Sequence, residues 1–197
     1  EGKSVKDGEK GELVVKKPFP SMPVKFWGDD DGQKYHKAYF TRFKNIWHHG
    51  DFIERTSNNG FIVRGRSDAT LNPGGVRIGT AEIYQQVENI NFITEGLVVG
   101  QDYNDDVRII LFVTTKDNED LDEEKIRIIK TRIRKNCSPK HVPSIIIKAP
   151  AIPRTKSGKI VELAVRKLIN GEELDNKQAI ANPESLDFFK NLSQLKT

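Results

Sequence analysis

The stretch Val107-Arg-Ile-Ile-Leu-Phe-Val-Thr-Thr115 is an apolar run of strand length, rich in β-branched residues. Runs of this length and composition are typical of buried β-strands. A second apolar run, at residues 96–100, precedes it and is bounded by glycines. Both runs therefore predict strands, and residues 144–148 predict a third, short one.

Helical patterns surround these strands. Residues 122–136 open with three acidic residues, end before Pro139 and carry an apolar row at helical spacing, made of Ile126, Ile129, Ile133 and Cys137. Thr80 is the expected N-cap of a helix over residues 81–89. A last helix is predicted at residues 160–170 and ends at Gly171. Strands and helices mixed in this order predict the α+β class, a short sheet flanked by helices.

Residues 1–66 show a different residue pattern, with short strand candidates in place of helical periodicity. Candidates at residues 51–55 and 60–64 flank Asn58-Asn59-Gly60, which is a hairpin signal. Residues 18–37 contain three prolines and a Gly/Asp run, so we expect an irregular loop there.

This change from strand-like to mixed helical and strand patterns predicts two domains. We expect a β-rich piece over residues 1–67 and an α+β domain over residues 68–197, with the boundary at Gly65–Asp68 as a linker. Residues from about 172 onward are polar and predict an extended or loosely docked tail.

The composition excludes several classes. The formal charge of +4 comes from 32 basic and 28 acidic residues, without the basic blocks or aromatic-basic interleaving of a nucleic-acid binder. No apolar run is long enough to cross a bilayer, and the first residues hold no signal peptide, so we expect no membrane partner. A single cysteine, Cys137, excludes an internal disulfide and suits a cytoplasmic protein.

The first site candidate is Lys159 in the run Pro153-Arg-Thr-Lys-Ser-Gly-Lys159. The run is not a phosphate-binding P-loop, because Pro153 replaces its first glycine and Ile160 replaces the hydroxyl residue that holds magnesium. A lysine on a mobile turn suits stabilising a carboxylate and a phosphate as they react. The alternative is an exposed surface lysine.

The other candidate site residues are each supported by weaker sequence evidence than Lys159. Gly74 and Gly75 allow positive φ angles or a close backbone approach to a ligand, although an ordinary turn explains them equally well. Arg66 and Arg77 bracket this turn with guanidinium groups that match carboxylate or phosphate. On the 122–136 helix, Arg134 belongs to a basic row that is otherwise a solvated face.

Asp51 follows His48-His49-Gly50 at the start of a strand candidate. Its carboxylate is placed to accept both hydroxyls of a ribose, or else to cap a turn. The histidines are not at metal-ligand spacing with any other ligand, so we expect no metal site built from side chains of this chain.

In this order, the motifs resemble the C-terminal part of the adenylate-forming acyl-CoA synthetases. The matching elements are Gly50-Asp51, Gly65-Arg66-Ser67-Asp68, Gly75-Val76-Arg77-Ile78 with Glu82-Ile83, and Pro153 through Lys159. Finer detail, including residues 17–24 and Asn182-Pro183-Glu184-Ser185-Leu186, is similar to the acetoacetate–CoA ligases. The resemblance covers nearly the whole chain.

For the first reaction step, the resemblance implies that a carboxylate attacks the α-phosphate of ATP, whose phosphates carry Mg²⁺. Asp51 and Arg66 are then expected to hold the ribose, and Lys159 to bridge the carboxylate and the α-phosphate. The C-terminal domain is then expected to rotate about Asp68 as the hinge.

For the second step, the resemblance implies that the thiol of coenzyme A displaces AMP. Gly74 and Gly75 are expected to line the pantetheine tunnel, where a side chain would obstruct it. Arg77 is expected to contact phosphate or stabilise the thioester-forming orientation, and Arg134 to contact coenzyme A. The family places a lysine where this chain has Asn72, and a variable residue where it has Pro73.

Upstream motifs of the family, among them its phosphate loop and its acid-substrate pocket, are missing from this chain. We therefore expect the chain to be a C-terminal part that works with the rest of the N-terminal domain and cannot form an adenylate alone. Its acyl substrate is acetoacetate by resemblance, or another short acid such as acetate or propionate. A non-catalytic module that binds coenzyme A or a partner is the alternative from a different class.

Overall fold

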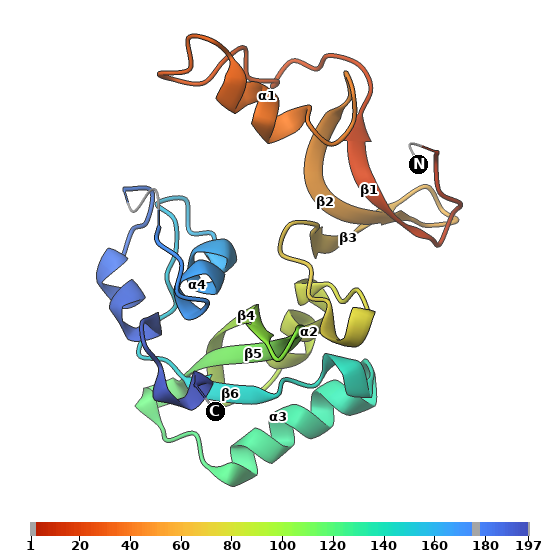
Figure 1. The fold of residues 1–197 in the computed structure, drawn as a ribbon. Coiled ribbons are helices and arrows are strands. Elements are labelled where there is room, and N and C mark those ends of the chain that lie inside the picture. Colours follow the sequence, from red (N-terminus) through yellow and green to blue (C-terminus); the bar gives the residue numbers. More distant parts are fainter. Residues whose placement is uncertain (1–2, 175–177, 197) are drawn as a thin grey trace. The chain divides into compact units, whose positions relative to one another are not determined.

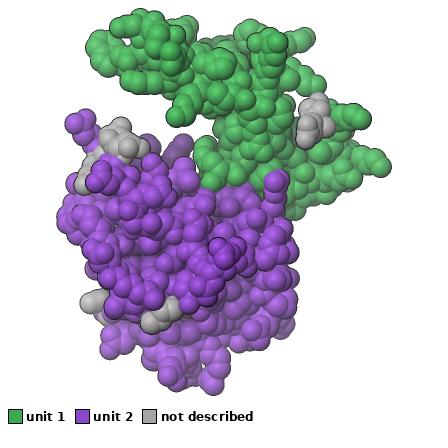
Figure 2. All heavy atoms as spheres, in the orientation of Figure 1, with its two compact units in different colours: residues 1–68 green, residues 69–197 purple. Residues whose placement is uncertain are grey.

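A computed structural model describes residues 3–174 and 178–196. The chain divides into two compact units, unit 1 (Glu1–Asp68) and unit 2 (Ala69–Thr197), which Figure 2 colours separately. Each unit contains a small three-stranded sheet with helices. The predicted α+β class is therefore confirmed. None of the helices in the described ranges combines the length and apolarity needed to span a membrane.

Unit 1 is built on an antiparallel sheet. Its strands β1 (Lys10–Val15), β2 (Trp47–Arg55) and β3 (Phe61–Arg66) lie in the order β1-β2-β3 (Figure 1). The turn between β2 and β3 is closed by a hydrogen bond of 2.9 Å from the Thr56 amide to the Gly60 carbonyl. Asn59 has a φ of 59° there, a left-handed conformation that asparagine tolerates. The predicted hairpin is confirmed.

The helix α1 (Gln33–Tyr39) lies partly inside the region predicted to be an irregular loop, so that prediction is wrong from Gln33 onward. The Asp29 carboxylate starts the helix, accepting hydrogen bonds from the amides of Lys34 at 2.9 Å and Tyr35 at 2.8 Å. Burial opposes ionisation of Asp29, but these hydrogen bonds outweigh it and lower the pKa of the carboxyl. Tyr39 then stacks on Trp47, with ring centroids 3.6 Å apart.

Unit 2 contains the second sheet, in the order β4-β5-β6. β4 (Ile93–Tyr103) and β5 (Asp106–Thr115) form an antiparallel hairpin, and β6 (Ile145–Lys148) pairs parallel with β5. All three predicted strands are confirmed. The first is longer than its apolar run because pairing with β5 extends it in both directions.

Both faces of this sheet are covered, as Figure 1 shows. Helices α2 (Thr80–Val87) and α3 (Glu123–Asn136) pack on one face, and α4 (Glu162–Ile169) and the C-terminal segment pack on the other. Along β5, successive residues alternate between the two cores, with Ile109, Leu111 and Val113 on the first face and Ile110 and Phe112 on the second. A strand buried on both faces has no polar alternation, which explains the continuous apolar run.

Two helix starts differ in their capping. The Asp122 carboxylate caps α3 by accepting the Lys125 amide at 2.8 Å, and Ile129 and Ile133 are fully buried, as the apolar row predicts. Thr80, in contrast, is not the N-cap of α2. It is the first helical residue and is buried, and the cap position belongs to Gly79, which has no side chain to bond an amide.

The prediction of a loosely docked tail is wrong for residues 178–196. This segment forms two 3₁₀ helices, Pro183–Phe189 and Ser193–Leu195, and buries four apolar side chains, Ile180, Leu186, Phe189 and Leu195. Phe189 packs edge-on against Phe112, with ring centroids 4.8 Å apart. These apolar residues lie in a stretch that is polar overall, and this polarity concealed them. Residues 175–177 and 197 of the predicted tail lie outside the described residues.

Candidate functional site

The structure brings the three predicted site residues of unit 1 together. Asp51 and Arg66 are paired across β2 and β3, and the Asp51 Oδ2 atom lies 3.9 Å from Arg66 Nη1. Arg66 also forks onto Asp68, with Nε 2.9 Å from Oδ1 and Nη2 2.5 Å from Oδ2. One guanidinium therefore lies between the carboxylate expected to bind ribose and the carboxylate expected at the hinge.

Local geometry shapes the surroundings of Asp51. Gly50 has a φ of +88°, and a Cβ there would lie 3.1 Å from Arg66 Nη2, so a side chain would crowd the guanidinium. His49 Nδ1 lies 2.5 Å from Asp51 Oδ2 and orients that carboxylate. The Asp51 side chain is 18% exposed, so one of its faces is open to a ligand.

Glu12 is a contributor to this site that the sequence did not reveal. Its Oε1 atom accepts a hydrogen bond of 2.7 Å from Ser67 Oγ and lies 2.9 Å from His48 Nε2. Glu12 thereby ties β1 to β2 and to the residue between Arg66 and Asp68. The partners lie 36 and 55 positions away in the sequence, so no local motif could have indicated the contact.

Lys159 lies exposed on a tightly hydrogen-bonded turn of unit 2. The Thr155 amide donates to the Lys159 carbonyl at 2.8 Å, and the Lys159 amide donates to Thr155 Oγ1 at 3.0 Å. Gly158 has a φ of +82°, which closes the turn at a position suited to glycine. The turn therefore holds the backbone of Lys159 while its side chain extends into solvent.

The Gly74–Gly75 turn adopts the positive φ angles that the glycines suggested, 57° and 77°. The Gly74 amide donates to both carboxylate oxygens of Asp106, at 2.9 and 3.0 Å. The amides of Val107 and Gly74 lower the pKa of Asp106. A Cβ on Gly74 would lie 2.9 Å from Lys140 Nζ, whereas a Cβ on Gly75 would meet no atom within 4 Å.

Arg77 and Arg134 are both exposed. Arg77 follows the glycine turn, and Arg134 lies in the last turn of α3. Across residues 3–174 and 178–196, no ion pair joins either arginine to an acidic side chain. Among the described residues, both guanidinium groups are therefore available to an anionic ligand.

A buried polar link joins the two helical layers of unit 2. The Tyr84 hydroxyl donates to Glu162 Oε1 at 2.5 Å and accepts from the Val98 amide at 3.0 Å. Burial and the Glu162 carboxylate raise the pKa of the Tyr84 phenol well above 10.0. The phenol therefore stays protonated and structural, fixing α2 and α4 on either side of β4.

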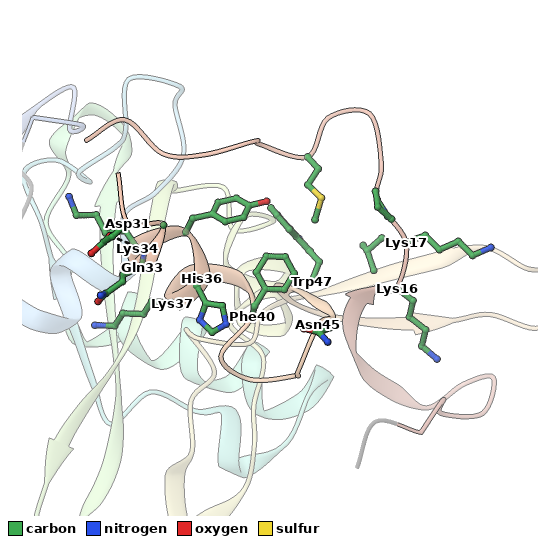
Figure 3. A pocket seen from close by; sticks show the side chains of 15 residues that line it. Lys16, Lys17, Asp31, Gln33, Lys34, His36, Lys37, Phe40, Asn45 and Trp47 are labelled. Carbon is green, nitrogen blue, oxygen red and sulfur yellow. Dashed lines mark hydrogen bonds between the residues drawn. The ribbon is translucent and has the colours of Figure 1, made fainter. Parts of the chain in front are cut away.

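Unit 1 also contains a hollow of about 1130 Å³ over α1 and β2, shown in Figure 3. Its aromatic wall includes Phe40 and Trp47, and its cationic side chains are Lys16, Lys17, Lys34 and Lys37. These residues come from separate segments, which is why the sequence did not predict the hollow. Metal-binding chemistry is absent there and elsewhere in the described part of the chain, where no three His, Cys, Asp or Glu residues form a metal-binding group.

Comparison with known proteins shows which proteins this chain resembles. No family model matches the chain. Acetoacetyl-coenzyme A synthetase from Rhizobium meliloti (strain 1021) is 59% identical over 197 residues, which is 100% of this chain and 30% of that protein. The solved acetoacetyl-CoA synthetase from Streptomyces lividans superposes with a TM-score of 0.88 at 41% identity, over 98% of this chain and 30% of that one. Over its whole length, the chain is therefore highly similar to a C-terminal portion of acetoacetyl-CoA synthetases.

The chain matches a C-terminal portion of the curated relative and spans about 30% of that protein's length. Similarity extends to other ligases. A benzoate CoA ligase from Burkholderia xenovorans LB400 matches with a TM-score of 0.69 at 26% identity, over 84% of this chain and 32% of that one. The predicted relationship to the adenylate-forming acyl-CoA synthetases is therefore confirmed.

Proposed function

We propose that this chain is the C-terminal part of an ATP-dependent, AMP-forming acetoacetate–CoA ligase. The observation that carries the proposal is the 59% identity with an acetoacetyl-coenzyme A synthetase across the whole chain. We call the protein formed with the remaining N-terminal domain the complete ligase. Its substrates are acetoacetate, ATP and coenzyme A, and Mg²⁺ enters with the ATP phosphates, its ligands lying outside this chain.

In the first step, an oxygen of the acetoacetate carboxylate attacks the α-phosphorus of ATP, and pyrophosphate leaves. The Asp51 carboxylate accepts the ribose hydroxyls, and Arg66 supports them from the neighbouring strand. The ammonium of Lys159 neutralises charge that builds up between the carboxylate and the α-phosphate. Its exposed position on a braced turn fits that role, because the side chain reaches outward from a fixed backbone.

In the second step, the sulfur of coenzyme A attacks the acyl carbon, and AMP leaves. Gly75 lines the thiol channel, where a side chain would obstruct it. The structure leaves this position open, because a Cβ placed there would meet no described atom within 4 Å apart from its chain neighbours. Arg77 and Arg134 bind phosphates of coenzyme A. Lys159 and Gly75 serve different steps at one reaction centre, so unit 2 alternates between two positions about Asp68, the last residue of unit 1.

Unit 1 is proposed to be the last subdomain of the N-terminal adenylation domain, and its surface supports this. Trp27 is 100% exposed and Val24 94% exposed, and the edge strand β3 exposes Phe61 and Val63. Exposed apolar patches of this kind mark surfaces that another part of a protein covers. We propose that the rest of the N-terminal domain packs there and over the hollow of Figure 3.

The proposed ligase is cytoplasmic. The single cysteine of this chain, Cys137, has a pKa raised by burial and by the nearby Glu82, so its thiol stays protonated. A thiol of this kind needs no partner and suits a reducing compartment.

Substrate choice tests the proposal directly. We expect the complete ligase to form a CoA thioester from acetoacetate at least about tenfold more efficiently, as kcat/KM, than from acetate or propionate. For each acid, the release of AMP would be measured as the signal of thioester formation. A preference for acetate or propionate would reject acetoacetate as the substrate, and no AMP release with any acid would reject the ligase. The isolated chain is expected to show no acetoacetate-dependent ATP–pyrophosphate exchange.

Gly75→Leu is expected to slow thioester formation from supplied acetoacetyl-adenylate about tenfold or more in the complete ligase, because the new side chain enters the channel. Adenylation should change less than about threefold. The φ of 77° also costs a leucine roughly 1–2 kcal/mol of folding stability. Gly171→Leu is the matched control, because Gly171 has a φ of 78° and is equally open but lies outside the turn. Equal losses in the two variants would contradict the channel role.

A further inference from the structure

The C-terminal segment forms a strap along the Lys159 turn. We use strap for residues 179–182. Thr155 and Ile180 form an antiparallel β-bridge. The Lys156 amide donates to the Ala179 carbonyl at 3.1 Å, and the Ala181 amide donates to the Arg154 carbonyl at 2.8 Å. The turn that carries Lys159 therefore obtains part of its backbone hydrogen bonding from residues more than twenty positions later in the chain.

The Asn182 side chain adds two hydrogen bonds at the base of the turn. Its Oδ1 atom accepts from the Arg154 amide at 2.9 Å, and its Nδ2 atom donates to the Ile152 carbonyl at 3.0 Å. These partners flank Pro153, which has no amide hydrogen of its own to offer. A backbone group left unpaired in this half-buried place would be costly, so one amide side chain satisfies both sides of the proline.

The strap is itself fixed to the core of unit 2. Ile180 is buried, and the Ser185 hydroxyl donates to the Asn182 carbonyl at 2.6 Å. Leu186 and Phe189 follow in the same segment and are buried, Phe189 in the core on the second face of the sheet. Asn182 therefore approaches the turn from an anchored position, which makes its two hydrogen bonds a constraint on the turn.

Arg154 connects Asn182 to the residues next to Lys159 through its own hydrogen bonds. Its Nε and Nη2 atoms bond Glu95 Oε1 at 2.9 and 2.5 Å, which fixes the guanidinium on β4. Its Nη1 atom donates to the Gly158 carbonyl at 2.6 Å. Asn182 thus holds the backbone of Arg154, and the side chain of Arg154 holds the peptide that leads into Lys159.

We propose that Asn182 is a positioning residue for Lys159, acting through Arg154 and the backbone of residues 152–158. The inference rests on the proposed function, because it assigns Lys159 to adenylation. Asn182 does not touch substrate. It restricts the directions in which the turn presents the ammonium, and its effect is therefore confined to the step that uses this ammonium. Displacement of a reacting group by about 1 Å is sufficient to slow a step up to about a hundredfold.

The test combines two measurements on Asn182→Ala. In this chain, hydrogen exchange of the Thr155, Lys156 and Gly158 amides is expected to become about tenfold faster, while β4–β6 keep their protection. In the complete ligase, acetoacetate-dependent pyrophosphate exchange is expected to fall about tenfold in kcat, with little change in the KM for ATP. Thioester formation from supplied acetoacetyl-adenylate should stay within about twofold of the unmodified enzyme.

Asn170→Ala is the matched control. Asn170 is a half-buried asparagine of the same unit whose Oδ1 atom accepts the Asp102 amide at 3.0 Å, away from the Lys159 turn. It should leave both the turn and the ratio of the half-reactions unchanged. Asn182→Ala is uninformative if it also lowers the protection of β4–β6, because unit 2 as a whole is then destabilised. In that case the same measurements are made on Asn182→Asp, which keeps the oxygen that accepts the Arg154 amide.

The outcomes separate this inference from the proposed function. Unchanged exchange in the turn, or equal loss of both half-reactions in Asn182→Ala, would overturn the positioning role. Faster exchange in the turn while the unmodified ligase forms no adenylate would overturn the proposed function and leave only the structural contact. Faster exchange with a selective loss of adenylation supports both.

Discussion

Replacing Lys159 by alanine in the complete ligase is expected to slow acetoacetate-dependent pyrophosphate exchange by about a hundredfold or more. In the adenylation transition state, negative charge of the acid and of the α-phosphate is brought together, and we propose that the ammonium of Lys159 neutralises it. Formation of acetoacetyl-CoA from supplied acetoacetyl-adenylate should be largely kept, because the proposed mechanism does not use Lys159 in that step. The two half-reactions are measured separately on the same preparation.

Lys156→Ala is the control for this variant. Lys156 lies exposed on the same turn and carries the same charge. It comes before Gly158 in the chain, however, whereas Lys159 comes directly after the bend at that glycine. It should change either half-reaction by less than about threefold. Equal loss of both half-reactions in Lys159→Ala would indicate a general defect in binding or folding. Little loss of either would show that Lys159 is an ordinary surface residue.

Replacing Phe189 by alanine is expected to destabilise unit 2 by about 3–5 kcal/mol. The ring is completely buried and packs against Phe112 in the core beneath α4, so its removal leaves a cavity that cannot collapse easily. Urea denaturation of the chain, followed by far-UV circular dichroism and by hydrogen exchange of β4–β6, measures the loss. A change below about 1 kcal/mol would contradict the docking of the C-terminal segment.

The chain offers two internal controls for this measurement. Both tryptophans, Trp27 and Trp47, lie in unit 1, so tryptophan fluorescence reports on that unit and should keep its urea midpoint. Phe188→Ala removes the neighbouring ring, which is only partly buried, and should cost clearly less than Phe189→Ala. A similar cost for the two variants would mean that the buried ring is not specifically packed.

Part of this fold and site was readable from the sequence because the signals are local. The apolar run of β5, the row of Ile129 and Ile133 on α3, and the hairpin at Asn59 each depend on residues a few positions apart. The same holds for the positive φ angles of Gly74 and Gly75, which only glycine adopts freely. The roles of Asp51, Arg66, Asp68, Lys159 and the other site residues came from ordered motifs and remain predictions.

What the sequence could not supply depends on contacts between distant segments. The hydrogen bond between Glu12 and Ser67 and that between Asn182 and Arg154 join residues 55 and 28 positions apart, so neither has a local signature. The helix α1 was hidden because its capping carboxylate, Asp29, lies in a run typical of a loop. The C-terminal segment was hidden because its stretch of sequence is polar overall, and only the folded unit provides the surface that buries its few apolar residues. The sequence by itself thus determined the elements that have a local, periodic signal, and which residues carry charge or flexibility. Only the tertiary structure decided which of them meet, because burial and hydrogen bonding reward proximity in space regardless of separation along the chain.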